Sequence, residues 1–189
     1  MLARKCLALT GTFETSRKPP VCFGEATGNF DGAGVSFGVL QWNIGQGTLQ
    51  PLLRRIHELD PKVIPHATAD KYDDFAYWIL ERKATKDQLK YVQTWQKGET
   101  LTHEWDDNLY EIGSSEAGTQ AQVEFANDYW EKGVALAKEL RLFSERGYAL
   151  CFDICVQQGT LKEKGRNTYK SNSELSANEE VRMEFVAKH

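Results

Sequence analysis

The sequence predicts a mainly helical fold of the α+β class with one small β element near the N-terminus. Apolar residues recur at helical spacing over most of the chain from Thr48 onwards. Before that, the segment 35–39 alternates apolar with small residues, which is the period of a short strand. The chain has 189 residues, of which 41% are hydrophobic and 26% charged. This length and balance predict one globular domain over residues 1–189 with a real core.

The N-terminal region is expected to contain a helix, a glycine-rich turn and then the strand. Arg4 to Thr15 has the pattern of a helix, which must stop by Pro19-Pro20 because proline cannot continue it. Val21 to Gly34 is rich in glycine and turn-forming residues. Within it, Asp31-Gly32-Ala33-Gly34 would form the hairpin turn that leads into the strand.

The remainder reads as a succession of helices. Leucine and isoleucine at helical spacing mark one helix from Leu49 that ends near Asp60-Pro61. Lys162 to Asn178 is polar and lacks periodicity, so a long loop is expected there. Further helices are expected at Ala69–Arg82, Lys86–Lys97, Thr119–Arg146, Tyr148–Gln158 and Asn178–Lys188.

Charge and hydropathy disfavour several function classes. The formal net charge of −4 and the isoelectric point near 5.6 argue against nucleic-acid binding, which normally shows a basic stripe. No apolar run has the length of a membrane span. The opening Met1–Leu9 is too short for a signal peptide and lacks a small-residue cleavage site. The abrupt ends lead us to expect a domain excised from a longer protein.

Neither a metal nor a cofactor is expected. Cys151 and Cys155 stand at i, i+4 spacing, which is poor geometry for a disulfide, and together with Cys6 and Cys22 they are expected to be buried free thiols. The histidines show no paired spacing of zinc ligands. The glycines lack the spacing of nucleotide-binding loops.

Two carboxylates in the N-terminal region suit the cleavage of a glycosidic bond. That reaction needs a carboxylic acid to protonate the leaving oxygen and a carboxylate to activate water or stabilise the cation. Glu14 closes an apolar helix, where desolvation would raise its pKa, and Asp31 lies among glycines, where it would stay charged. Ser36 follows on the strand, where its hydroxyl could orient the attacking water. Alternatively, Glu14 is a solvated residue at a helix end and Asp31 an ordinary turn former. Glu25 is the rival second carboxylate.

Read together, these residues resemble a known active-site signature. Glu14 followed by Asp31-Gly-Ala-Gly-Val-Ser-Phe-Gly-Val-Leu resembles the signature of the chitosanase family in the lysozyme-like superfamily. A second stretch, Thr119 to Val156, looks like the long central helix of that family and the buried helix after it. By this resemblance Asp153 would support the catalytic glutamate through an ionic network, with Arg182 as the candidate basic partner. An alternative for Asp153 is that it only caps a neighbouring group.

The block after the strand departs from chitosanases. Gly-Val-Leu-Gln at 38–41 looks more like the Gly-Leu-Met-Gln block of goose-type lysozymes and lytic transglycosylases, which cut peptidoglycan. The amides of Gln41 and Asn43 could hydrogen-bond the N-acetyl group of such a sugar. Trp42 offers a ring for a sugar face, although packing beneath the cleft is an equal alternative.

The resemblance implies a lysozyme-like fold with two helical lobes, a small β-hairpin and a cleft between them. It implies a muramidase that hydrolyses the peptidoglycan glycan strand at the bacterial cell wall. A chitosanase is the alternative enzyme, and a non-catalytic glycan-binding or interaction domain is the alternative of another class. A parent secretion-system or phage protein, and an immunity protein, are the expected protein partners.

Overall fold

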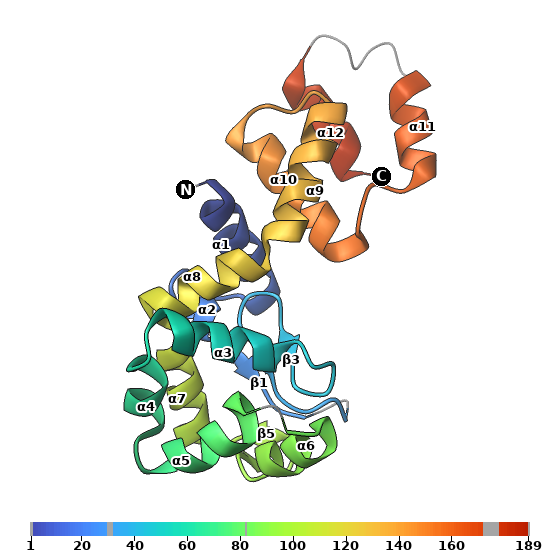
Figure 1. Cartoon of the computed structure of the whole chain (residues 1–189). Coiled ribbons are helices and arrows are strands. Elements are labelled where there is room, and N and C mark those ends of the chain that lie inside the picture. The colour runs from blue at the N-terminus through green and yellow to red at the C-terminus, as the bar shows by residue number, and fades with distance from the viewer. Residues whose placement is uncertain (1, 30–31, 82, 172–177, 189) are drawn as a thin grey trace. The chain divides into compact units, whose positions relative to one another are not determined.

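The chain is mainly helical, as the sequence predicts. The computed structural model describes residues 2–29, 32–81, 83–171 and 178–188, and within them helices dominate two small antiparallel sheets (Figure 1). Contacts divide the chain into two compact units. The larger unit is Gly11–Phe125, and the smaller one joins Met1–Thr10 to Ala126–His189.

The first helix, α1 (Leu2–Thr15), confirms the predicted N-terminal helix and contributes residues to both units. In the larger unit a short helix, α2 (Val21–Gly24), follows Pro20. It lies where the sequence predicts only a glycine-rich turn. The reason is tertiary, because α2 buries Cys22 and Phe23 and packs against helix α7 (His103–Ser114).

The predicted strand is the central one of a three-stranded antiparallel sheet. β2 (Ser36–Phe37) pairs on one side with β1 (Ala26–Thr27) and on the other with β3 (Trp42–Asn43). In this register Ser36 lies opposite Thr27 and also opposite Asn43. The predicted hairpin turn falls in the β1–β2 connection, and its first residue, Asp31, lies outside the described residues.

Helix α3 (Leu49–Leu59) agrees with the prediction, but the chain after it is more broken than expected. A short helix, α4 (Val63–Thr68), precedes the segment predicted as one helix from Ala69 to Arg82. That segment is a succession of three short pieces, which are the 3₁₀ turn η1 (Ala69–Lys71), α5 (Tyr72–Phe75) and the π-helical η2 (Ala76–Leu80). Ala69 has a positive φ of 47°, which separates α4 from this segment, whereas the junctions within the segment at Lys71, Phe75 and Ala76 keep right-handed helical angles.

The next predicted helix, Lys86–Lys97, is also shorter than expected. Helix α6 (Thr85–Gln93) ends early, and a hairpin of β4 (Gln96–Lys97) and β5 (Thr100–Leu101) follows. Gly98, with a φ of 70°, allows that turn. Helix α7 was not predicted, and Thr102 caps its start by accepting a hydrogen bond from the Trp105 amide.

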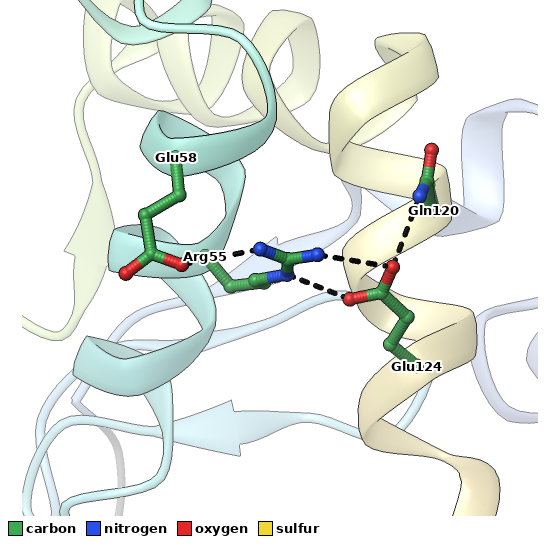
Figure 2. Close-up of polar contacts among 4 residues, drawn as sticks. All are labelled: Arg55, Glu58, Gln120 and Glu124. Carbon is green, nitrogen blue, oxygen red and sulfur yellow. Dashed lines mark hydrogen bonds and ion pairs between the residues drawn. The ribbon is translucent and has the colours of Figure 1, made fainter.

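Two kinds of packing hold the larger unit together. Phe75, Trp95 and Trp105 stack on one another, with 4.2 Å between the ring centroids of the two tryptophans. Helix α3 packs against α8 (Glu116–Phe125). Figure 2 shows Arg55 of α3 reaching Glu124 of α8, with its Nε 2.7 Å from the carboxylate.

The smaller unit has a core of its own. Helices α9 (Asn127–Glu139) and α10 (Glu145–Gln158) pack side by side, and α12 (Glu179–Ala187) packs on α10. The buried core residues of this unit include Leu136, Leu140, Leu142, Cys151, Ile154 and Cys155.

Two predictions for this part of the sequence are wrong. The expected single helix Thr119–Arg146 is divided, since α8 ends at Phe125 and α9 ends at Glu139. Arg141 adopts a positive φ of 54°, and the turn buries Leu142. The expected loop Lys162–Asn178 contains helix α11 (Glu163–Ser171), whose Tyr169 hydroxyl donates to the Leu140 carbonyl; positions 172–177 lie outside the described residues.

Candidate functional site

The side chains of the two proposed catalytic carboxylates, Glu14 and Asp31, are not among those that the structure describes. Glu14 is the penultimate residue of α1, and its side chain is outside the description. Asp31 is outside the described residues altogether. Gly32, which follows it, is exposed and has a φ of 83°, a conformation that suits glycine. The candidate site is therefore built from the three-stranded sheet, in which Asp31 belongs to the β1–β2 connection of the sequence.

Ser36, the predicted water-orienting residue, is tied to Asn43 across the β2–β3 pair. The Asn43 side-chain amide donates to the Ser36 hydroxyl, with 2.9 Å between Nδ2 and Oγ. The side-chain oxygen Oδ1 of Asn43 accepts from the Gln46 backbone amide at 3.2 Å, and this obligatory donor fixes which end of the Asn43 side-chain amide faces Ser36. The hydroxyl accepts in this bond, so its own hydrogen can donate to another group.

Asn43 is more buried than a side chain that contacts a bound sugar would be. It is only 3% exposed, and its amide is engaged with Ser36 and Gln46. The backbone N–H of Asn43 also donates a hydrogen bond to the Thr48 hydroxyl at 2.8 Å. These contacts hold the Asn43 side-chain amide in place beside Ser36.

Gln41 and Trp42 occupy different environments. Gln41 is half-buried in the β2–β3 turn with a φ of 52°, and its amide donates to the Gly38 carbonyl at 2.9 Å. Its side-chain oxygen accepts from the Thr27 hydroxyl at 3.0 Å. Trp42 is 9% exposed and packs edge-on against Phe125, with 6.5 Å between ring centroids. Burial thus favours the packing alternative for Trp42.

Gln122 is a supporting residue to which sequence reasoning assigned no role. Its side chain is fully buried on α8, and its oxygen accepts from the Val39 backbone amide at 3.0 Å. Its amide nitrogen donates to the Phe23 carbonyl at 2.8 Å. One side chain therefore joins α8 and α2 to the β2–β3 turn. The signal in the sequence that could have identified Gln122 is a glutamine at a position of the helix where an apolar residue is expected.

Glu25, the rival second carboxylate, lies immediately before β1. Its side chain is 30% exposed, with 3.8 Å between its carboxylate and Nε of Arg17. Its backbone carbonyl accepts from the Gly38 amide at 2.8 Å, so the sheet fixes its position. It remains the alternative to Asp31.

Asp153, the predicted supporting residue, is half-buried on α10 in the smaller unit. Its carboxylate accepts a hydrogen bond from the Thr10 hydroxyl of α1 at 3.1 Å. Thr10 precedes Glu14 by one turn of the same helix. Arg182, the candidate basic partner, donates from Nη2 to the Arg141 carbonyl at 2.9 Å.

The cysteines are buried free thiols, as expected. Burial raises the pKa of Cys151 to about 12 and that of Cys6 to about 11. Among the described residues, no group of three or more His, Cys, Asp or Glu side chains could hold a metal ion. Every helix in the described part of the chain is too short or too polar to span a lipid bilayer.

Comparisons with protein-family models, curated proteins and solved structures found no match to this chain.

Proposed function

We propose that this chain is a muramidase that hydrolyses the glycan strand of peptidoglycan at the bacterial cell wall, on a lysozyme-like fold. Glu14 would be the general acid and Asp31 the general base. The proposal rests on the resemblance of the segment from Glu14 to Gln41 to the signatures of chitosanases and goose-type lysozymes. The mainly helical chain with a small antiparallel sheet after its first helix is compatible with it.

In this mechanism each carboxyl group has one proton to move. Glu14 donates its proton to the glycosidic oxygen as the bond from the anomeric carbon breaks. Asp31 accepts a proton from a water molecule whose oxygen attacks that carbon from the opposite face. The products are two shorter glycan chains, and the two carboxyl groups are left in exchanged protonation states until solvent restores them.

The observation that carries the proposal is the Ser36–Asn43 pair. The Ser36 oxygen accepts from a buried amide, so the hydroxyl hydrogen is left to donate to a water molecule or a carboxylate. Ser36 lies five residues after Asp31, at the start of the strand that the Asp31 loop enters. This arrangement supports a role for Ser36 in holding the attacking water beside Asp31.

The test is to incubate the chain with purified peptidoglycan and, separately, with chitosan, and to identify the released fragments by mass spectrometry. We expect muropeptides from peptidoglycan and little release from chitosan. The matched control is Glu14→Gln, which keeps the size of the side chain but has no proton to donate. Greater release from chitosan would favour the chitosanase alternative, and binding without cleavage would favour a glycan-binding domain.

A further inference from the structure

The connection between β1 and β2, which carries Asp31 in the sequence, has a hydrogen bond between its two ends. The side-chain oxygen Oδ1 of Asn29 accepts from the backbone N–H of Gly34 at 2.8 Å. Asn29 and Gly34 lie on either side of Asp31 in the sequence. Gly34 is buried, and an N–H group that loses its partner in such surroundings is costly. The Asn29 side chain therefore fixes the distance between the two ends of the segment 29–34.

The end of this connection that follows Asp31 is bonded to the chain that leaves β3. The Ala33 carbonyl accepts from the Gly45 backbone N–H at 2.8 Å. The Val35 carbonyl accepts from the Ile44 backbone N–H at 3.1 Å. The chain therefore enters β2 from a position that the neighbouring strand determines.

The end that precedes Asp31 is bonded to a hairpin far along the sequence. Gln96 of β4 accepts from the backbone N–H of Asn29, with 2.6 Å between Oε1 and the nitrogen. The Nε2 of Gln96 donates to the Val92 carbonyl of α6 at 3.0 Å. A backbone N–H can only donate and a carbonyl can only accept, so these two contacts fix the orientation of the Gln96 amide.

The same hairpin also lies directly against the residue before Asn29. A Cβ added to Gly28 would lie 2.0 Å from the Glu99 carbonyl oxygen and 2.9 Å from Oε1 of Gln96. These distances are shorter than any side chain can tolerate, so glycine allows the two backbones to approach. The hydrogen bond from Asn29 to Gln96 therefore belongs to a close contact between β1 and the β4–β5 hairpin.

The middle of the connection is open where the structure describes it. Gly32, directly after Asp31, is exposed, and a Cβ added to it would meet nothing within 4 Å. Gly28 and Gly34, in contrast, are buried. Bonded ends beside an open middle suit a catalytic group that must meet its substrate at a fixed place.

We propose that Asn29 and Gln96 are positioning residues for the general base Asp31, an assignment that rests on the proposed function. Asn29 sets the distance between the ends of the connection, and Gln96 fixes where the connection begins. A general base acts only within hydrogen-bond reach of the water that it activates. A displacement of about 1 Å can lower a rate about a hundredfold. Through Gln96, the β4–β5 hairpin would influence the rate without supplying a reacting group.

The test compares Gln96→Leu and Asn29→Ala with the matched control Ser115→Ala in the full chain. Ser115 also accepts from a backbone N–H, that of Gly118 at 2.9 Å, and also donates to a carbonyl, that of Ile112 at 2.7 Å. All three variants should lower the midpoint of urea unfolding. Only Gln96→Leu and Asn29→Ala should lower kcat on peptidoglycan, by at least about tenfold, while KM changes by less than about twofold.

Two further measurements separate positioning from a general loss of structure. Asn29→Asp keeps an oxygen that can accept from the Gly34 N–H, so it should restore kcat to within about threefold of the wild-type value. Its kcat is taken from the plateau of the pH profile, because the added charge can shift the pKa of Asp31. In NMR spectra, the backbone amide of Gly32 should shift in Gln96→Leu and not in Ser115→Ala. This second measurement does not require activity.

The positioning role would be overturned by a normal kcat in Gln96→Leu, or by an equal loss of kcat in Ser115→Ala. An Asn29→Asp variant as slow as Asn29→Ala, or a Gly32 amide that does not move in Gln96→Leu, would also overturn it. Cleavage by the wild type with a normal kcat in Gln96→Leu would refute only the positioning role. Failure of the wild type to cleave peptidoglycan would refute the proposed function, and the positioning role with it.

Discussion

The Asn43 amide and the Ser36 hydroxyl form a directed pair across two strands, with Asn43 donating and Ser36 accepting at 2.9 Å. Asn43 is nearly completely buried, whereas Ser36 is half-buried. The buried partner is in turn fixed by the Gln46 backbone amide. The Ser36 oxygen is therefore used as an acceptor by a fixed amide, and its hydrogen is left to donate elsewhere.

We expect Asn43→Asp and Ser36→Ala each to lower kcat on peptidoglycan by about tenfold, which corresponds to the loss of one oriented hydrogen bond. The Asn43→Asp carboxylate can only accept, so it would take the Ser36 hydrogen away from the water. Because the two residues act through one hydroxyl, the double variant should lose little more than Ser36→Ala alone. Losses that multiply would show that Asn43 acts independently of Ser36.

The roles of the two carboxylates can be separated by the stereochemistry of the product. Glu14→Gln should lower activity by at least about a hundredfold, because the leaving oxygen then receives no proton. Asp31→Asn should be equally severe if Asp31 activates the water. NMR of the first-formed product should then show an inverted anomeric configuration. Retention, or an anhydro-sugar end, would exclude Asp31 as the base, and full activity of Glu14→Gln would make Glu25 the next residue to test.

Gln122 should be important for stability and not for chemistry. Gln122→Leu leaves the Val39 amide and the Phe23 carbonyl without their buried partner. We expect the free energy of unfolding to fall by about 3 kcal/mol, measured by urea denaturation. The matched control is Gln120→Leu, whose exposed side chain bonds Glu124, and it should change stability by less than about 1 kcal/mol. Similar losses in the two variants would contradict a structural role specific to Gln122.

The ion pair between Arg55 and Glu124 predicts a small dependence of stability on pH (Figure 2). The hydrogen bond from Arg55 lowers the pKa of Glu124 below its ordinary value of 4.5. The stabilisation is therefore fully present above pH 4.5 and is lost as the pH falls through the lower value of the folded state. Glu124→Gln should cost less than about 1 kcal/mol at pH 7, because the pair is part-exposed, and nothing once the carboxyl is protonated. In an Arg55→Gln background this pH dependence should become smaller, and only the part due to the Gln120 hydrogen bond should remain.

The thiols should be unreactive in the native chain. Burial raises the pKa of Cys151 to about 12, so almost no thiolate is present at neutral pH. A thiol reagent at pH 8 should label the native protein slowly and should find four thiols after denaturation. Rapid labelling of the native chain would show that one of these cysteines is accessible.

Regular amphipathic segments were predictable from the sequence, whereas breaks and short elements were not. The leucines at helical spacing predicted α3 nearly to its ends, and the alternation of apolar and small residues predicted the strand at Ser36. The predicted long helix from Thr119 failed because its apolar pattern continues across the breaks near Ala126 and Arg141. Periodicity records which residues are buried and is insensitive to a local change in backbone direction.

For the candidate site, the sequence indicated which residues to consider, but it did not indicate which of them form hydrogen bonds with one another. The resemblance of the segment that contains Glu14, Asp31 and Ser36 to a known signature is what implies acid, base and water-orienting roles for them. Asn43 meets Ser36 because the strand register places the two residues opposite each other. Gln122 meets the backbone amide of Val39 although it lies on a helix far along the chain. The buried hydrogen bond from Gln50 of α3 to Gln88 of α6, at 2.7 Å, likewise depends on how these two helices pack. Local sequence thus determined the mainly helical class and indicated which residues to propose for the chemistry. Tertiary structure alone decided which polar groups meet, because hydrogen bonds form between segments whose separation in sequence carries no information about their distance in space.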